Sequence, residues 1–205
     1  MEVAVLAKKK EDKKKAGKPS TAKPFLADME AIRKRAREHI DQGPVTGAYR
    51  ADRDTVVKLL NEALATEIVC VLRYKRHYYL AEGIHAESVA AEFLEHANEE
   101  QAHADQIAAR IVQLGGKPDF SPDGLASRAH SDYHAGDDLV EMMKEDLIAE
   151  RIAIETYSEM IRYVGDDDPV TRHMLVGILA NEEEHADDLA SLLEGIDAKW
   201  RRGRG

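Results

Sequence analysis

The chain has 205 residues, of which 43% are hydrophobic, 33% charged and only 5% aromatic, and its formal net charge is −10. A chain of this length can bury one sizeable core, and its low content of glycine and proline excludes collagen-like and fully disordered proteins. A single cysteine excludes an internal disulfide framework and is typical of a reducing compartment. Because no apolar stretch is as long as a membrane span, we expect a cytoplasmic protein without membrane contact.

Residues 1–24 form the first segment, a lysine-rich arm. They contain eight lysines and three acidic residues, a net charge of +5 that leaves −15 for the rest of the chain. Such apolar-poor sequence cannot bury enough surface to order itself, so we expect a disordered arm. Several copies of the arm on one oligomer would bind DNA without sequence preference, a hypothesis that we rank below a simple solvated tail.

Helical segments follow in chain order. A short candidate helix at 26–41 ends before Gly43-Pro44, so residues 25–50 are predicted to form a short N-terminal helix and a linker. Strand alternation is absent, and the connections between the later segments are short, long and short. The sequence therefore predicts an all-α four-helix bundle over residues 51–196, followed by a basic C-terminal stub at 197–205. The four long helices are expected at 53–82, 86–114, 137–163 and 168–194.

Each long helix carries one glutamate in the middle of its apolar face: Glu67, Glu100, Glu150 and Glu182. A buried carboxylate without a partner costs several kcal/mol, and no arginine or lysine shares these faces near the glutamates. A bound cation is therefore the simplest compensation. Clusters of salt bridges are the less favoured alternative.

The spacing of these glutamates divides the bundle into two similar hairpins. Glu67 and Glu100 are 33 residues apart, and Glu150 and Glu182 are 32 apart. The midpoints fall at Gly83 and within the GDDD sequence, where the turns are expected. Residues equidistant from the turn of an antiparallel hairpin lie at the same depth, so each pair should lie level and face inward.

A histidine follows the second glutamate of each pair by three residues. The two Glu-x-x-His motifs end at His103 and His185. Residues at i and i+3 project from one helix face, so both side chains of a motif can reach one metal ion. A connection of about 22 residues is long enough to cross the bundle and bring the two hairpins' pairs together.

The six residues Glu67, Glu100-Gln-Ala-His103, Glu150 and Glu182-Glu-Glu-His185 resemble the di-metal carboxylate pattern of the ferritin superfamily. Within it, the stretches LLNEALATEIVCVLRY and DLIAERIAIETYSEMIRYVGDDD are similar to bacterioferritin and to its Dps-like, DNA-protection relatives. The resemblance covers roughly residues 50–195. It implies a ferritin-like bundle in which a long crossover connects helices two and three.

The resemblance also implies a role for each ligand: two iron ions, each held by one glutamate and one histidine and both bridged by the remaining two glutamates. The bridging pair would be Glu100 and Glu182, and the terminal pairs Glu67 with His103 and Glu150 with His185. Asp146, one turn before Glu150, resembles a carboxylate that orients a ligand histidine. Tyr74 resembles a tyrosine often found beside such centres, and a core tyrosine bonded to a carboxylate is an equally good interpretation.

Three features depart from the family pattern. Gln101 stands where bacterioferritins have a haem-ligating methionine, so we expect no haem. The short basic end after helix four is unlike the fifth helix of bacterioferritins, and a complete site within one chain is unlike Dps proteins, which build theirs between subunits. We expect a Dps-like homo-oligomer of twelve subunits, with twenty-four as the alternative. Cys70 is expected to be a small buried hydrophobic residue.

The ligand types limit the chemistry. Carboxylates and imidazoles suit iron or manganese, and two ferrous ions can deliver two electrons to hydrogen peroxide or dioxygen. We therefore predict a ferroxidase that stores ferric iron in a hollow shell and protects against oxidative stress. The acidic body would attract Fe²⁺. The other histidines are expected on the surface or in loops: His77, His96, His130, His134 and His173.

Two other functions stay open. One is a di-iron or di-manganese peroxidase or catalase of the rubrerythrin type, which the lack of a Cys-x-x-Cys module makes less favoured. The other is a nucleoid protein whose main role is to bind DNA.

Overall fold

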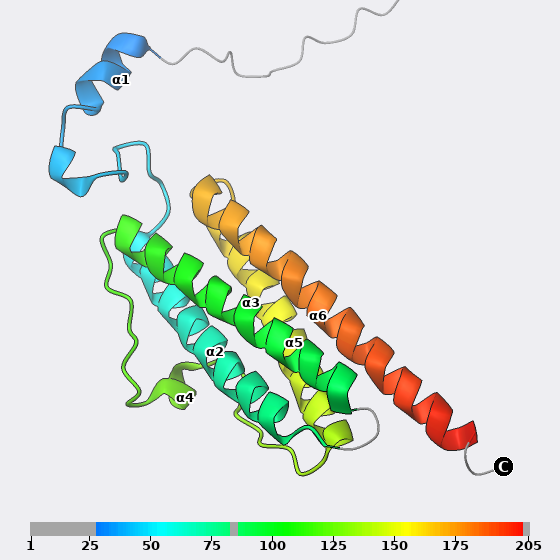
Figure 1. Ribbon diagram of the computed structural model, residues 1–205. Coiled ribbons are helices and arrows are strands. Elements are labelled where there is room, and N and C mark those ends of the chain that lie inside the picture. Colours follow the sequence, from blue (N-terminus) through cyan, green and yellow to red (C-terminus); the bar gives the residue numbers. More distant parts are fainter. Residues whose placement is uncertain (1–27, 83–85, 203–205) are drawn as a thin grey trace, which may run out of the picture.

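The computed structural model describes residues 28–82 and 86–202, with side chains placed up to residue 196. Within these residues all regular structure is helical, which confirms the all-α prediction (Figure 1). The long helices are α2 (Arg53–Leu80), α3 (Ala86–Gln113), α5 (Leu139–Val164) and α6 (Pro169–Arg202). The short ones are α1 (Met29–Arg35), a 3-10 turn (Ile40–Gln42) and α4 (Leu125–Arg128).

The bundle consists of two antiparallel hairpins, α2 with α3 and α5 with α6 (Figure 1). The crossover between them, residues 114–138, returns along the bundle, so α3 and α5 run in the same direction. Further contacts join α2 to α5 and α3 to α6, which closes the four helices around one interior. The predicted ferritin-like topology is therefore confirmed. Helix α4, which the periodicity does not predict, lies in the crossover and packs against α2.

Aspartates cap three of the four helices that line this interior, α2, α5 and α6. Asp52 accepts a hydrogen bond from the backbone N–H of Thr55 at 2.8 Å, and Asp138 caps α5 in the same way. At α6 the carboxylate of Asp168 accepts from the N–H of Thr171 at 2.9 Å, and the following proline has no N–H to leave unpaired. These caps fix where the long helices begin and hence the level of the residues along them.

Two apolar clusters close the interior on either side of the four glutamates. On α2, Glu67 lies between Leu64 of the first cluster and Cys70 of the second, and Cys70 is buried as expected. The polar middle of the bundle is therefore sealed at both ends by aliphatic and aromatic side chains. The first cluster includes Leu64, Ile107, Tyr157 and Ile178, and the second Cys70, Phe93, Met143 and Leu189.

The segments outside the bundle differ from their predictions. In place of one helix over 26–41, the described residues contain α1 and a separate 3-10 turn. Asp28 caps α1, but none of its residues is buried, so no packing prolongs the helix. At the other end, α6 continues to Arg202, past the expected end at 194, since no proline interrupts it.

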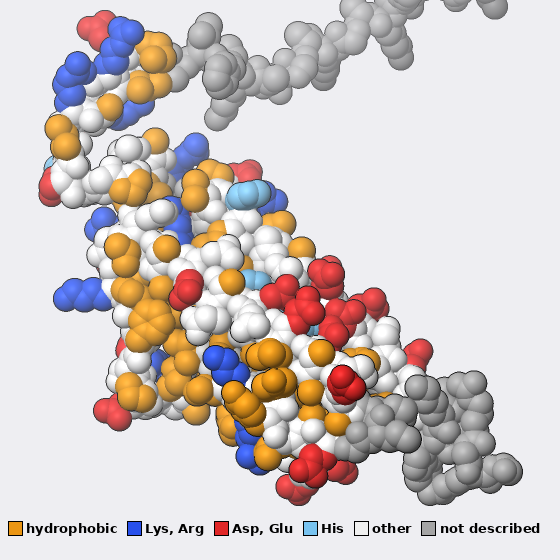
Figure 2. Space-filling view, in the orientation of Figure 1, with side chains coloured by type: hydrophobic (Ala, Val, Ile, Leu, Met, Phe, Trp, Pro, Cys, Tyr) orange, Lys and Arg blue, Asp and Glu red, His pale blue; other side chains and the backbone are white. Residues whose placement is uncertain are grey.

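Charge is unevenly distributed over the surface. On the face shown in Figure 2, acidic side chains gather over the middle of α6, and lysines and arginines gather on α1. The exposed acids of that part of α6 are Glu183, Glu184 and Asp187. The lysine-rich arm predicted at 1–24 lies outside the described residues. None of the described helices is long and apolar enough to cross a membrane.

Candidate metal centre

The structure brings all six residues of the predicted site together in the middle of the bundle. Each of the four long helices contributes one glutamate, and α3 and α6 each add the histidine one turn further on. Every one of these side chains is at most 3% exposed. The helix caps and the level spacing of the two hairpins therefore assemble one buried cluster from residues far apart in the sequence.

Four of the six residues surround the first candidate ion position. The Nδ1 atom of His103 lies 3.1 Å from Oε1 of Glu182. It lies 3.4 Å from Oε2 of Glu67 and also 3.4 Å from Oε2 of Glu100. One ligand atom from each of the four residues lies within 4.8 Å of the others. One cation can therefore contact all four at once.

The second position repeats this arrangement with the other histidine. The Nδ1 atom of His185 lies 3.5 Å from Oε1 of Glu100, 3.7 Å from Oε2 of Glu182 and 3.9 Å from Oε2 of Glu150. Glu100 and Glu182 thus each direct one oxygen to the first position and the other oxygen to the second. A carboxylate placed in this way can bridge two metal ions.

The unpaired polar atoms of the cluster fit two cations. Buried polar groups in native proteins almost always have a hydrogen-bond partner. Here each of the six residues has at least one buried oxygen or nitrogen that has none among the described residues. Two divalent cations would satisfy these atoms, and mixed carboxylate and imidazole ligands suit iron or manganese.

The pKa shifts divide the four carboxylates into two kinds. Burial, followed by the charge of Glu100, raises the pKa of Glu67 from its ordinary 4.5 to about 8. Burial, with Glu100 and Glu182, also raises the pKa of Glu150. Burial acts in the same direction on the bridging pair, but the facing histidines and terminal glutamates outweigh it and lower the pKa of both Glu100 and Glu182.

The histidines complete the charge balance of the metal-free protein. Burial disfavours the charged imidazolium, but the surrounding carboxylates raise the pKa of both rings, that of His185 to about 11. In the metal-free protein the terminal glutamates and the histidines therefore hold protons more tightly than they would in water. Divalent cations bound in the cluster would replace such protons.

Two tyrosines hold the terminal glutamates. Tyr74 donates a hydrogen bond to Glu150, and Tyr157 donates one to Glu67. Tyr74 follows Glu67 by seven residues and Tyr157 follows Glu150 by seven, so each tyrosine binds the glutamate of the other hairpin. Both interpretations of Tyr74 apply, because Tyr74 is a core tyrosine and its hydroxyl donates to Glu150, a carboxylate of the candidate centre. The role of Tyr157 could have been found from the same spacing.

The outward nitrogens of the two histidines meet different partners. Nε2 of His103 lies 3.4 Å from Oδ1 of Asn181, whereas Nε2 of His185 lies 2.6 Å from Oε2 of Glu99. Both partners directly precede a bridging glutamate in the sequence. Such contacts orient a ligand histidine, and a carboxylate also makes it a stronger base. The sequence pattern predicts neither of these two contacts.

Three statements of the sequence analysis are wrong. Asp146 does not contact a ligand histidine: it binds Nε of Arg73 and Nδ1 of His77, each at 2.7 Å. Arg73 is therefore a buried cation close to the glutamates, although its charge is paired with Asp146. His77 and His96 are buried, not on the surface, because the inward face of each helix is wider than a single stripe.

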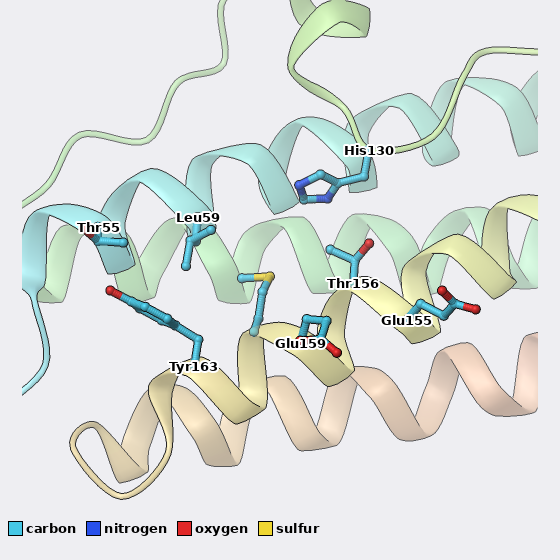
Figure 3. Close-up of a pocket in the computed structure, with 8 residues that line it drawn as sticks. Thr55, Leu59, His130, Glu155, Thr156, Glu159 and Tyr163 are labelled. Carbon is cyan, nitrogen blue, oxygen red and sulfur yellow. The ribbon is translucent and has the colours of Figure 1, made fainter.

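A groove elsewhere on the bundle is separate from this cluster. It has a volume of about 540 Å³ and lies between α2 and α5, and none of the six residues lines it. Figure 3 shows Tyr163 of α5 directed toward Thr55 of α2, with His130 of the crossover further along the groove. Its lining is mostly apolar, so we do not assign it to the metal centre.

The fold and the cluster together define the class of protein: an all-helical bundle with a buried centre of carboxylates and histidines. A family model described as ferritin-like domain matches residues 57–198. The chain therefore belongs to the ferritin-like family.

Relatives narrow the position within that family. The chain is 29% identical over 149 residues to the bacterioferritin of Rhodobacter capsulatus, which covers 72% of this chain and 88% of the relative. It is 30% identical over 141 residues to the bacterioferritin of Brucella melitensis, with 68% and 83% covered. These are distant bacterioferritin homologues, as the sequence motifs predict.

Solved structures of bacterioferritin-related and Dps proteins are also similar to this chain. A bacterioferritin-related protein of Bacteroides fragilis, described as a dodecameric thioferritin, matches with a TM-score of 0.72 and 32% identity, covering 74% of this chain and 92% of that one. Dps from Thermosynechococcus elongatus matches with a TM-score of 0.66 at 20% identity, covering 68% and 90%. The second likeness concerns the fold alone.

Proposed function

We propose that this protein is a ferroxidase that binds two Fe²⁺ ions per chain, oxidises them with hydrogen peroxide or dioxygen, and stores the ferric product in a hollow homo-oligomer. The observation that carries the proposal is the sharing of Glu100 and Glu182 between two four-residue groups. Two cations held by shared carboxylates lie about 3.5–4 Å apart, close enough to react with one oxidant molecule. The same ligands suit Mn²⁺, which is the alternative metal.

The reaction balances with the two ferrous ions as substrate. Each Fe²⁺ gives up one electron, and the two electrons with two protons convert one hydrogen peroxide into two waters. The protein's part is to bind and orient. The terminal glutamates and histidines fix each ion, Tyr74 and Tyr157 hold the terminal glutamates, and the apolar clusters on both sides keep bulk water out.

A homo-oligomeric shell is the second part of the proposal. The Bacteroides fragilis relative is described as dodecameric, and we propose twelve subunits here, with twenty-four as the alternative. Large apolar side chains that the described chain exposes support a subunit contact: Leu72 and Tyr79 on α2, and Ile148 and Tyr163 on α5. We propose no haem, because Gln101 offers no thioether and donates instead to Asp105 at 3.1 Å.

The test replaces each bridging glutamate separately. We expect Glu100→Ala and Glu182→Ala to slow Fe²⁺ oxidation at least ~100-fold, since losing even a residue that supports a metal ligand costs 10–100-fold. Stopped-flow absorbance of the ferric product measures the rate with each oxidant, and light scattering measures the assembly. Exposed acids on the same helices provide the matched controls Asp105→Ala and Glu184→Ala, which should oxidise Fe²⁺ like the parent.

Unchanged oxidation kinetics in both bridging variants would contradict the ferroxidase assignment. Consumption of peroxide by the parent protein without loss of Fe²⁺ would instead identify a peroxidase.

A further inference from the structure

A second cluster of metal-ligating side chains lies beside the centre. It consists of Glu92 and His96 of α3 and Asp188 of α6, with one ligand atom from each within 4.8 Å of the others. The Nε2 atom of His96 lies 3.3 Å from Oε1 of Glu92 and 4.0 Å from Oδ2 of Asp188. None of the three belongs to the six residues of the centre.

Hydrogen bonding fixes which nitrogen of His96 carries its proton. The hydroxyl of Tyr74 donates to the carboxylate of Glu150, so its oxygen is left to accept from Nδ1 of His96, 3.2 Å away. The proton of a neutral His96 is therefore on Nδ1, and Nε2 presents a lone pair.

The Nε2 atom of His96 faces the carboxylates of Glu92 and Asp188. His96 is 1% exposed, and its Nε2 atom has no hydrogen-bond partner among the described residues. Burial and the nearby Asp188 raise the pKa of Glu92, as expected where two carboxylates crowd together. A buried lone pair with neither a donor nor a cation beside it is unfavourable, and a cation shared with Glu92 and Asp188 would satisfy it.

We propose that Glu92, His96 and Asp188 bind a third divalent metal ion, of the first transition row. An imidazole nitrogen with two carboxylate oxygens is a ligand set for iron, manganese or zinc, not for calcium or magnesium, which prefer oxygen ligands alone. Three protein ligands leave coordination positions for water.

This third site lies between solvent and the centre. The side chains of Glu92 and Asp188 are 28% and 45% exposed, whereas the His96 ring stacks on that of His185 with centroids 4.0 Å apart. The acidic patch over the middle of α6, which Figure 2 shows, would attract cations to the same region. If the proposed ferroxidase function is correct, the third site holds an Fe²⁺ ion beside the centre, with the stacked rings of His96 and His185 between them.

Counting bound ions tests the site without any activity measurement. The full-length protein, stripped with chelator and dialysed against Co²⁺, should bind three ions per chain. The variant Glu92→Gln/Asp188→Asn should bind two, and its partly exposed, isosteric changes spare the core. The matched control Asp105→Asn/Glu194→Gln removes the same charge from exposed positions of α3 and α6 and should still bind three.

Anomalous diffraction from crystals soaked in Co²⁺ locates the ion, with a peak expected at bonding distance from Nε2 of His96. Glu100→Ala/Glu182→Ala should lose the centre's ions but keep this peak, so failure of the proposed function and failure of the third site give different results. Equal ion counts in the Glu92→Gln/Asp188→Asn variant and the parent, or no peak beside Nε2 of His96, would overturn the proposal.

Discussion

The bundle contains buried charges of two kinds, which differ in whether the protein pairs them. Arg73 is buried between α2 and α5, and its three nitrogens meet Asp146, the carbonyl of Asp132 and the sulfur of Cys70. Asp146 uses its second oxygen for His77, whose other nitrogen meets the carbonyl of Ala135 at 3.0 Å. This network is complete and attaches the crossover to the bundle.

A second complete network joins α3 to the start of α6. Arg110 contacts both oxygens of Asp168, at 2.7 and 2.9 Å, and its Nε donates to Thr171 at 2.8 Å. Tyr49 donates to the same carboxylate at 3.0 Å and so attaches the segment before α2. Both networks place a cation of the protein against an anion of the protein.

The candidate metal centre differs from both networks, because its carboxylates face one another and each of its six residues has a buried oxygen or nitrogen without a partner among the described residues. A complete network, in which every buried charge is paired, stabilises the fold and cannot bind a further ion. A buried cluster with unpaired atoms destabilises the metal-free protein, and bound cations restore that stability. Variants that remove one member should therefore have opposite effects in the two kinds of cluster.

The largest effect is expected from Asp146→Ala. Removing one partner of a buried ion pair leaves the other charge unpaired, which costs about 3–5 kcal/mol. For a chain of this size, that lowers the melting temperature by about 10 °C. Thermal unfolding followed by circular dichroism measures the change, and the folded variant should still bind the centre's two ions. A melting temperature equal to that of the parent would show that the Arg73 network contributes nothing to stability.

A smaller effect of opposite sign is expected from Glu67→Gln in the metal-free protein. Because folding raises the pKa of Glu67 from 4.5 to about 8, the native state holds its proton more tightly, and stability falls as the pH rises through this range. Glutamine does not titrate and still accepts from Tyr157. At pH 9 the variant should melt about 2–5 °C above the parent.

The same comparison at pH 4.5 provides the control, since Glu67 is then protonated in the folded protein. The two melting temperatures should converge there. A variant less stable than the parent at pH 9 would contradict the view that the centre's carboxylates are strained when no metal is bound. The variant should also lose one of the centre's two ions.

The meeting of the six candidate ligands could be predicted from the sequence because regular spacing determines it. Helical period and equal distance from a turn place Glu67 level with Glu100, and Glu150 level with Glu182, and no atomic detail is needed. The rest depends on how the helices are rotated and on which neighbour faces them. His96 precedes Glu100 by four residues and Asp146 precedes Glu150 by four, so both lie on inward faces, but their partners come from other helices.

The helices outside the bundle interior were harder to predict, because they lack the apolar period that packing against other helices imposes. The interior of the bundle imposes an apolar period that the sequence displays, so the ends of the four long helices were predicted to within two residues, except that α6 continues past its expected end. Helix α1 buries nothing, so its length depends only on local propensity, which is a weak signal. Helix α4 is four residues long, too short for any period to be recognised.

The smallest effect concerns the difference between the two halves of the centre. His185 is backed by the Glu99 carboxylate at 2.6 Å and His103 by the Asn181 amide at 3.4 Å, so His185 should be the more basic ligand. We expect Glu99→Gln to weaken the ion beside His185 by about tenfold, the lower end of the usual range, because Glu99 is 42% exposed. Asn181→Asp should strengthen the binding of the ion beside His103.

Stepwise Co²⁺ titration resolves the two affinities, with Glu184→Gln as the control. If Glu99→Gln and Asn181→Asp both leave the two affinities unchanged, the outer contacts only orient the rings, and the two metal positions are equivalent despite their different surroundings.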